Sequence, residues 1–337
     1  MKIKNIFFAA AAAMALTACS SDDAIETVQQ QSQFPEDGVM RFTTNLVDPT
    51  IATTRASITG SDVNQNGQQF QVKIVNPASA TYSYFNTVQY NGTEWTPVNR
   101  MLWQNDQQRI DVTAAYKQGK TFSDYEFIVG ANLTVAADQS TEAKLKQQDL
   151  LTMPTKTIAN PSIEQTLMQN GKLVINFYHA LTKLDVTLEL KDEFYPANIQ
   201  ASDITEFTIK GTNAGYQFKA METANENYGT VTVTASTAAD ILANQYNFTA
   251  GTAESKHSTA KYEAIIVPQT IAAGQLTVSF KIGNRSFSWT NTQAYTLEQG
   301  KKYTLPLTVG NNGVTAGVRG FTASYWEDQP GDNLGTE

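Results

Sequence analysis

Two histidines are the side chains of this sequence best suited to proton transfer near neutral pH, and neither stands in a catalytic pattern. His179 and His257 lie far apart in the chain, and no cysteine is near either of them. The motifs of zinc proteases, serine hydrolases and phosphate-binding loops are absent from the sequence. We therefore expect no catalytic residue and no cofactor, and we interpret His179 as a packed or hydrogen-bonding histidine.

One short segment has the composition of a cation site. Asp62 to Gly67 (DVNQNG) matches the first half of a calcium-binding loop. The twelfth position of that loop, where a glutamate should bind the ion through both oxygens, is Lys73. No helical pattern flanks the segment, so we interpret it as a polar turn before a strand at Phe70 and expect no metal site. Weak calcium binding is the alternative.

The charge balance argues against a nucleic-acid partner. Lys and Arg number 24 against 32 Asp and Glu, which gives a net charge of −8, and the cations form no cluster. The acidic residues are scattered too, and no two of them are marked out as the carboxylate pair of a glycoside hydrolase. Cys19 is the single cysteine, so an intrachain disulfide is excluded. The folded chain must be held together by burial of its apolar side chains.

The N-terminus reads as a lipoprotein signal peptide over residues 1–18. Lys2 and Lys4 precede a short apolar run, IFFAAAAAMAL, that is too short to span a bilayer. The run ends in Leu-Thr-Ala-Cys, which resembles the bacterial lipobox. That resemblance implies cleavage between Ala18 and Cys19 and acylation of Cys19, for example by palmitate, with enough acyl chains for stable anchoring. Residues 19–37, acidic and then Gln-rich, are predicted to be a flexible tether.

Residues 39–47 are predicted to be the first strand. Met40, Phe42, Thr44 and Leu46 alternate with more polar residues, which is typical of a half-buried strand. Asp48-Pro49 ends the pattern, and residues 48–57 form a small-residue loop whose single cation is Arg55. Two interpretations remain open at this point: a first strand designed to be removed, or an ordinary strand followed by an ordinary loop.

Short alternating segments continue through residues 38–177. They predict strands at Phe70–Ile74, at 110–116, at 126–129 and at 173–177, and a helix over 141–151 with Thr141 as its cap. Asn91-Gly92 has the composition of a two-residue hairpin turn. These segments predict an N-terminal β-sandwich domain over 38–177.

Residues 178–337 show a similar succession of short alternating segments. Leu184 to Leu190 alternates without interruption, residues 238–246 suggest a short helix, and residues 314–326 form a C-terminal strand. Many short strands, few helices and no alternation of strands with helices predict an all-β fold. We expect two tandem antiparallel β-sandwich domains of transthyretin-like or Greek-key type, joined near residues 176–183.

Four features together resemble the fimbrillin family of surface lipoprotein pilins. They are the lipobox with its acidic follow-on, the loop Ala52-Thr53-Thr54-Arg55-Ala56, the stretch 173–190 (LVINFYHALTKLDVTLEL), and the C-terminal run 303–326. The resemblance covers most of the chain. It implies two tandem β-sandwich domains, outer-membrane export, and assembly into a fimbrium for cell adhesion.

The resemblance also assigns roles to particular residues. It implies cutting of the Arg55–Ala56 bond by an arginine-specific protease and loss of the strand that carries Met40, Phe42, Thr44 and Leu46. A strand of another fimbrial subunit then fills the groove by donor strand exchange. The candidate donor strand is 314–326, with the side chains Val314, Ala316, Val318, Phe321 and Trp326. Its apolar alternation changes phase at Gly320, so either a bulge lies there or the strand stays in its own domain.

These expectations leave three hypotheses. The leading one is a structural, non-enzymatic fimbrial subunit at the cell surface, anchored to the outer membrane until it is matured. The second is an uncleaved anchor or tip subunit of the same family. The third is a surface lipoprotein that binds glycans through exposed Trp side chains. The adhesive target would be a glycan or protein of a host or bacterial surface.

Overall fold

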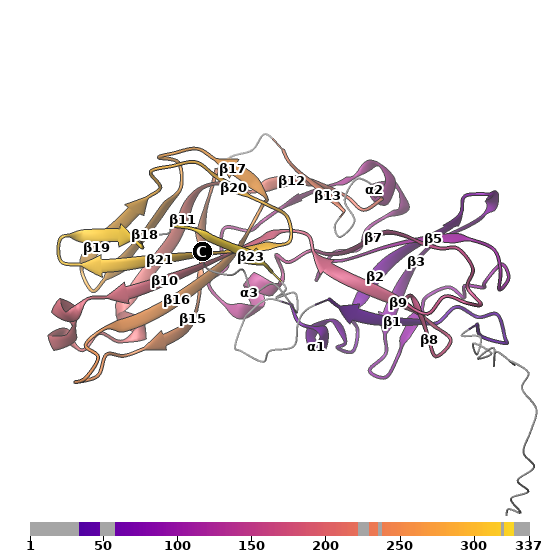
Figure 1. The fold of residues 1–337 in the computed structure, drawn as a ribbon, viewed down its shortest axis with the longest axis horizontal. Helices are drawn as coiled ribbons and strands as arrows, with labels where there is room; N and C mark the ends of the chain where they lie inside the picture. The colour runs from indigo at the N-terminus through magenta and orange to yellow at the C-terminus, as the bar shows by residue number, and fades with distance from the viewer. Residues whose placement is uncertain (1–33, 48–57, 222–228, 235–237, 318–319, 327–337) are drawn as a thin grey trace, which may run out of the picture. The chain divides into compact units, whose positions relative to one another are not determined.

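β-strands make up most of the computed structural model, which describes residues 34–47, 58–221, 229–234, 238–317 and 320–326 (Figure 1). The predicted all-β fold is therefore confirmed. Several predicted features lie outside the described residues: the signal peptide 1–18 with the acylation site Cys19, the loop 48–57 with Arg55 and Ala56, and the side chain of Val318.

The first set of strands builds one sheet. Its members are β1 Phe42–Leu46, β2 Gln69–Asn76, β3 Ser79–Tyr90, β4 Trp95–Pro97, β5 Ile110–Tyr116, β7 Leu151–Ile158, β8 Met168–Gln169 and β9 Lys172–His179. Their order in the eight-stranded sheet is β1-β4-β3-β2-β5-β7-β9-β8, and β1 also pairs with β9. Because β1 joins β4 to β9, the sheet closes on itself. Its interior holds a core that runs from Met40 to Phe177 in sequence.

Two larger sheets pack against each other in the second half. The six-stranded sheet has the order β15-β16-β10-β21-β22, with β23 also paired to β21, and the four-stranded sheet has the order β14-β11-β18-β19. Phe207 of β11 stacks on Tyr262 of β16, with ring centroids 3.7 Å apart, so these two sheets share a core. The strands are β10 Thr182–Leu190, β11 Ile204–Asn213, β14 Ala238–Leu242, β15 Asn244–Thr249, β16 Ser258–Ile266, β18 Thr277–Ile282, β19 Arg285–Thr290, β21 Lys301–Gly310, β22 Gly313–Ala316 and β23 Thr322–Tyr325.

Two smaller sheets complete the strands. The first has the order β13-β12-β6, from β13 Thr230–Val233, β12 Gly215–Lys219 and β6 Ala131–Thr134, and the second pairs β17 Gln269–Ile271 with β20 Tyr295–Leu297.

The connection between β5 and β7 crosses into the second half. It carries α2 Asp124–Val129, β6 and α3 Glu142–Lys146. Phe122, Phe127 and Leu145 from this connection are buried in the core of the larger sheets. The division into domains at residues 177 and 178 therefore stays a prediction, and segments before this division contribute to the core that lies beyond it.

Two local predictions are wrong. Residues 126–129 are not a strand but the end of α2, because the Ser123 side chain caps the helix and the Glu126 carboxylate accepts a hydrogen bond from the Ser123 backbone N–H. Residues 238–246 are not a helix but β14 and the start of β15, which pair with β11 and β16. In both places the partners that decide the structure lie in the surrounding fold rather than in the apolar pattern.

The hairpin at Asn91-Gly92 is real, but its loop is longer than predicted. β3 and β4 pair through Tyr90 and Trp95, which leaves residues 91–94 in the loop. The Asn91 side chain accepts hydrogen bonds from the backbone N–H groups of Thr93 and Glu94, both at 2.9 Å. This Asn-centred turn takes the place of the two-residue turn. The predicted strand 110–116 and the Thr141 cap of α3 are confirmed, but the helix predicted over 141–151 ends at Lys146, and Leu151 begins β7.

Candidate functional site

The first strand, β1, is the element that closes the N-terminal sheet. It runs parallel to β9 from the pair Phe42–Leu173 to the pair Leu46–Phe177, and it meets β4 at the pair Phe42–Trp95. Backbone hydrogen bonds continue this ladder: Leu173 N–H donates to the Arg41 carbonyl at 2.8 Å, and Val47 N–H donates to the Phe177 carbonyl at 3.0 Å. Removal of β1 would leave β4 and β9 as two unpaired edges.

The inward-facing side chains of β1, together with Met40 just before it, fill the core of this sheet. Met40 is 0% exposed and Phe42 is 1% exposed, while Leu46 is partly buried against the same core. The ring of Phe42 packs edge-on against Phe70, with centroids 6.1 Å apart. Phe70 in turn contacts Phe177 at 5.5 Å between centroids. The predicted inward face of the strand is thus the face that contacts the core.

Thr44, the third residue of this inward face, is hydrogen-bonded rather than packed. Its hydroxyl donates to Asn64 Oδ1 at 2.9 Å and accepts from Trp95 Nε1 at 3.1 Å. Trp95 Nε1 also donates to Asn64 Oδ1 at 2.8 Å, so the three side chains form a closed triangle. Asn64 and Trp95 lie outside β1 and contact it through Thr44. No spacing in the sequence predicts that these side chains come together.

The chain is fixed on both sides of β1. Before the strand, Arg41 forms an ion pair with Asp37, and this guanidinium holds the pKa of the Asp37 carboxyl well below its usual range. After the loop 48–57, Ile58 is 1% exposed in the same core as Phe42. Residues on the C-terminal side of that loop therefore have their own attachment to the core.

The segment that resembles a calcium loop serves as part of this attachment. Thr59 caps the short helix α1 Gly60–Val63, and Asp62 completes the capping box. Asp62 also forms an ion pair with Lys146 of α3 at 2.9 Å. Hydrogen bonds from Thr59 and Lys146 lower the pKa of Asp62 despite its burial, which raises it. The carboxylate is thus engaged by protein groups.

The candidate donor strand lies along β21 of its own chain. β22 pairs with β21 from Leu307–Ala316 to Gly310–Gly313, and β23 pairs with it from Thr304–Thr322 to Lys301–Tyr325. Both pairings are antiparallel, and the strand is interrupted between them, where Gly320 has a φ of +56°. Val314, Ala316 and Phe321 are partly buried, and Trp326 is buried. The strand is thus interrupted near Gly320, where the sequence predicted a change of phase. Both of its parts, β22 and β23, pair with β21 of the same chain.

Neither histidine lies in this site. His179 is fully buried, its Nδ1 is 2.9 Å from the Asp149 carboxylate, and its ring stacks on Trp326 at 4.3 Å between centroids. The interpretation of His179 as a packed, hydrogen-bonding histidine is confirmed. His257 is exposed between Glu189 and Asp192, and its hydrogen bonds to these carboxylates raise its pKa.

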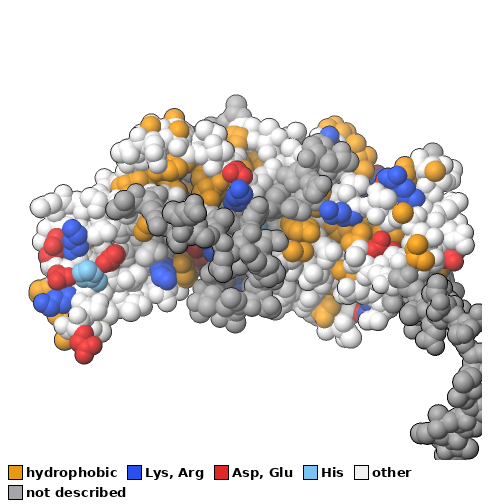
Figure 2. Space-filling model, in the orientation of Figure 1, with side chains coloured by type: hydrophobic (Ala, Val, Ile, Leu, Met, Phe, Trp, Pro, Cys, Tyr) orange, Lys and Arg blue, Asp and Glu red, His pale blue; other side chains and the backbone are white. Residues whose placement is uncertain are grey.

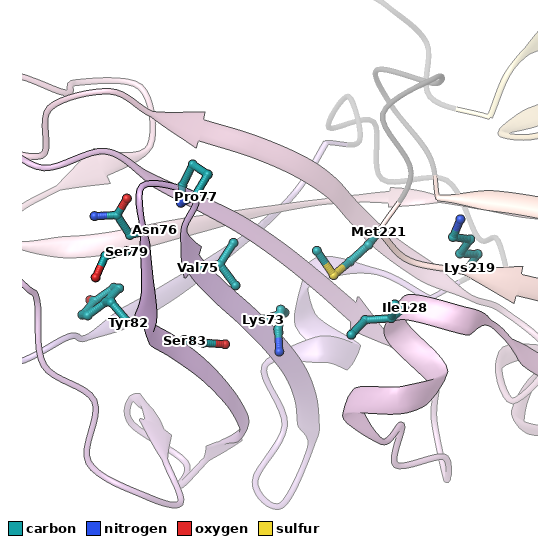
Figure 3. A pocket seen from close by; sticks show the side chains of 10 residues that line it. All are labelled: Lys73, Val75, Asn76, Pro77, Ser79, Tyr82, Ser83, Ile128, Lys219 and Met221. Carbon is teal, nitrogen blue, oxygen red and sulfur yellow. The ribbon is translucent and has the colours of Figure 1, made fainter.

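The Trp side chains do not support the hypothesis of a glycan-binding surface. Of the four Trp residues, Trp95, Trp103 and Trp326 are buried and Trp289 is half-buried, so none is an exposed platform. A shallow pocket of about 520 Å³ lies beside the β2–β3 hairpin, with Tyr82 at one end and Ile128 and Met221 at the other (Figure 3). None of the side chains that line it is acidic.

On the face seen in Figure 2 the charged side chains lie in small groups, most of them of mixed sign, and no extended basic patch is seen. Among the described residues, no three His, Cys, Asp or Glu side chains gather as metal ligands would. Over the same ranges, no helix is both long enough and apolar enough to cross a membrane.

Packed β-sheets with a first strand that closes the N-terminal sheet define an all-β class of protein. More particularly, the chain belongs to the fimbrillin-like family, whose model matches residues 54–326. This membership makes it a surface protein of the fimbrial, adhesion type. No curated protein matches the chain.

Solved structures from two Bacteroides species share the fold. A proposed cell adhesion protein from Bacteroides uniformis is 18% identical, with a TM-score of 0.54 over 87% of this chain and 99% of the other. A proposed cell adhesion protein from Bacteroides ovatus is 15% identical, with a TM-score of 0.56 over 86% of this chain and 98% of the other. At such identities the likeness concerns the fold alone.

Proposed function

We propose that this protein is a structural subunit of a fimbrium that assembles by exchange of its first strand. The observation that carries the proposal is the position of β1: among the described strands it joins β4 to β9, and it holds the side chain of Phe42 in the core, with Met40 buried just before it. The loop 48–57 that follows β1 contains Arg55, the candidate cleavage point. A cut there frees the strand from the covalent chain.

Loss of β1 creates an acceptor slot, which we define as the space between β4 and β9. Its floor includes the aromatic side chains of Phe70 and Phe177, which β1 now covers. Water would contact this apolar surface and two rows of unpaired backbone groups. A strand from another subunit satisfies both needs at once, and each large side chain that it buries contributes about 1.5–3 kcal/mol. The joint between subunits is therefore strong.

The donor in this scheme is the C-terminal strand 314–326 of a neighbouring subunit, through Val314, Ala316, Val318, Phe321 and Trp326. β22 and β23 have β21 as their strand partner, and the strand is already interrupted between them. A strand held along one side only can leave its sheet with fewer hydrogen bonds broken than a central strand. The free strand then adds to the acceptor by β-strand addition.

Export and maturation precede assembly in this proposal. The signal peptide directs the chain out of the cell, acylated Cys19 holds it in the outer membrane, and an arginine-specific protease cuts the Arg55–Ala56 bond at the surface. The resulting fibre serves adhesion to a glycan or protein, and the subunit needs no cofactor. Ile58 and the α1 cap keep the new N-terminal segment attached to the core after the cut.

Replacement of Arg55 by Ala tests the cleavage step. Wild-type protein recovered from its own cells should run as heat-sensitive ladders in detergent, and Arg55→Ala protein should run as a monomer. Arg41→Ala is the matched control, since it removes the same charge from the residue just before β1 and leaves residues 48–57 unchanged. Ladders that persist in Arg55→Ala cells would remove the cleavage role.

Mass spectrometry of the N-terminus separates the alternatives within the family. An assembled stalk subunit begins at Ala56, whereas an uncleaved anchor begins at acylated Cys19. A tip subunit would be matured but would lie only at fibre ends, which labelled antibodies can locate.

A further inference from the structure

The hydrogen-bond triangle of Thr44, Asn64 and Trp95 places a polar contact within an otherwise apolar strand interface. The neighbouring inward residues, Met40 and Phe42, are fully or almost fully buried hydrocarbon. Trp95 is 5% exposed, and its ring packs against Phe70 at 4.9 Å between centroids. An indole N–H buried in this way needs an acceptor.

A hydroxyl at this position bonds to both partners, although Trp95 Nε1 also has Asn64 Oδ1 as an acceptor at 2.8 Å and Asn64 is open to solvent. Thr44 Oγ1 donates to Asn64 Oδ1 and accepts from Trp95 Nε1 at the same time. A valine of the same shape does neither, and a carboxylate can accept from Trp95 but would face the amide oxygen of Asn64 without a proton to donate. Serine keeps both hydrogen bonds but loses the β-branched shape that suits a strand.

Asn64 and Trp95 do not depend on β1 for their positions. Asn64 follows α1, whose capping box is formed by Thr59 and Asp62. Trp95 begins β4, which pairs with β3 through Tyr90. Because the two side chains also hydrogen-bond to each other at 2.8 Å, their arrangement is set before a strand enters.

We propose that Asn64 and Trp95 make the acceptor slot selective for an incoming strand with a serine or threonine two residues after its central large apolar side chain. The partner is thus a strand of a different kind of fimbrial subunit, one that places large apolar groups where Met40 and Phe42 lie and a hydroxyl where Thr44 lies. The chain's own strand 314–326 has Ala316 and Ala323 two residues after Val314 and Phe321, so it would enter the slot without these hydrogen bonds. This inference rests on the proposed strand exchange and adds to it the side-chain chemistry by which the slot accepts or rejects a donor.

A nicked form of the full chain provides the test. A site for a sequence-specific protease is inserted between Arg55 and Ala56, so that cutting leaves the N-terminal piece bound without a covalent link. Fluorescent peptides with the sequence of residues 39–47 then compete for the slot. The set contains the wild-type peptide and the changes Thr44→Val, Thr44→Ser and Thr43→Val, the last being the control on the outward face.

The Thr44→Val peptide should bind about fivefold more weakly than wild type, which corresponds to the loss of one ordinary hydrogen bond. Thr44→Ser should lie between them, and Thr43→Val should match wild type. In a nicked chain that carries Asn64→Ala, the difference between the wild-type and Thr44→Val peptides should shrink.

Equal binding of the wild-type and Thr44→Val peptides would overturn the selectivity and leave strand exchange intact. If no peptide enters the nicked chain, wild type included, strand exchange itself is refuted and the selectivity with it. The two failures are thus distinguished by the behaviour of the wild-type peptide.

Discussion

The substitution Phe42→Ala tests whether Phe42 belongs to the core of the uncut chain only, or also to the core of the assembled subunit. Phe42 is 1% exposed and packs edge-on against Phe70 inside the closed sheet. Removing a buried phenyl ring loses its transfer free energy and leaves a cavity, which typically costs about 3–5 kcal/mol. We expect the uncut chain to lose that much stability, since neighbouring rings pack around the site and cannot all collapse into the space.

The assay is urea unfolding of the uncut precursor followed by Trp fluorescence, with Trp95 as a probe close to the change. Thr43→Ala is the matched control, because Thr43 lies on the opposite face of β1. The unfolding free energy of this variant should stay within about 0.5 kcal/mol of the wild-type value. Assembled fibres are then collected from cells that express each variant. Fibres that form from Phe42→Ala protein should resist heat and detergent as wild-type fibres do, because mature subunits no longer contain residue 42.

Two results would refute this reasoning. A precursor that loses less than about 1 kcal/mol would show that Phe42 is not part of the stabilising core. Phe42→Ala fibres that dissociate at a lower temperature than wild-type fibres would show that β1 remains in the assembled subunit.

Three further predictions concern the second half. Gly211→Ala should destabilise the protein strongly in thermal unfolding, because the φ of Gly211 is +86° and an added Cβ would lie 1.9 Å from a backbone oxygen. Gly274→Ala is the control: its φ is +80° but the space around it is open, so the substitution should cost only about 1–2 kcal/mol. Lys183→Met should cost about 3–5 kcal/mol because it removes the cation that lies 2.5 Å from the buried Glu263 carboxylate, and adding Glu263→Leu should restore most of the loss in the same unfolding assay. His257 should titrate above 6.5 by NMR, since its carboxylate partners raise its pKa; the stability that this pairing adds is present at low pH and disappears as pH rises through the raised pKa.

The sequence identified the all-β class and the inward face of the first strand because both depend on alternation along one segment. Met40 and Phe42 are buried as the period of two requires. The same rule misled at residues 126–129, where one buried residue, Phe127, is flanked by exposed Tyr125 and Ile128. A single turn of helix is too short for its period to show, and the Ser123 cap determines it.

Sequence reasoning could not find the acceptor side of the candidate site. Asn64 stood in a segment that resembled a cation loop, and Trp95 stood in a hairpin, with no pattern to link them to Thr44. Their contacts join segments distant in the chain, which only a closed sheet brings together. The sequence placed Trp326 in the candidate donor strand but did not predict its contacts. In the structure Trp326 is buried, and its ring stacks on His179.

The direct passage from β9 into β10 has a mechanical consequence. β1 lies parallel to β9, and only residues 180 and 181 separate β9 from β10, which is central in its sheet and paired with β16 and β21. In the proposed fibre, a donor strand that replaces β1 in the same direction would also lie parallel to β9. Tension along such a fibre acts along the strands, so the hydrogen bonds of each ladder share the load instead of opening one after another. The force then passes from one sheet to the next through the covalent backbone. The contact surface between the two halves need not bear it, and the subunit can withstand pulling without a disulfide.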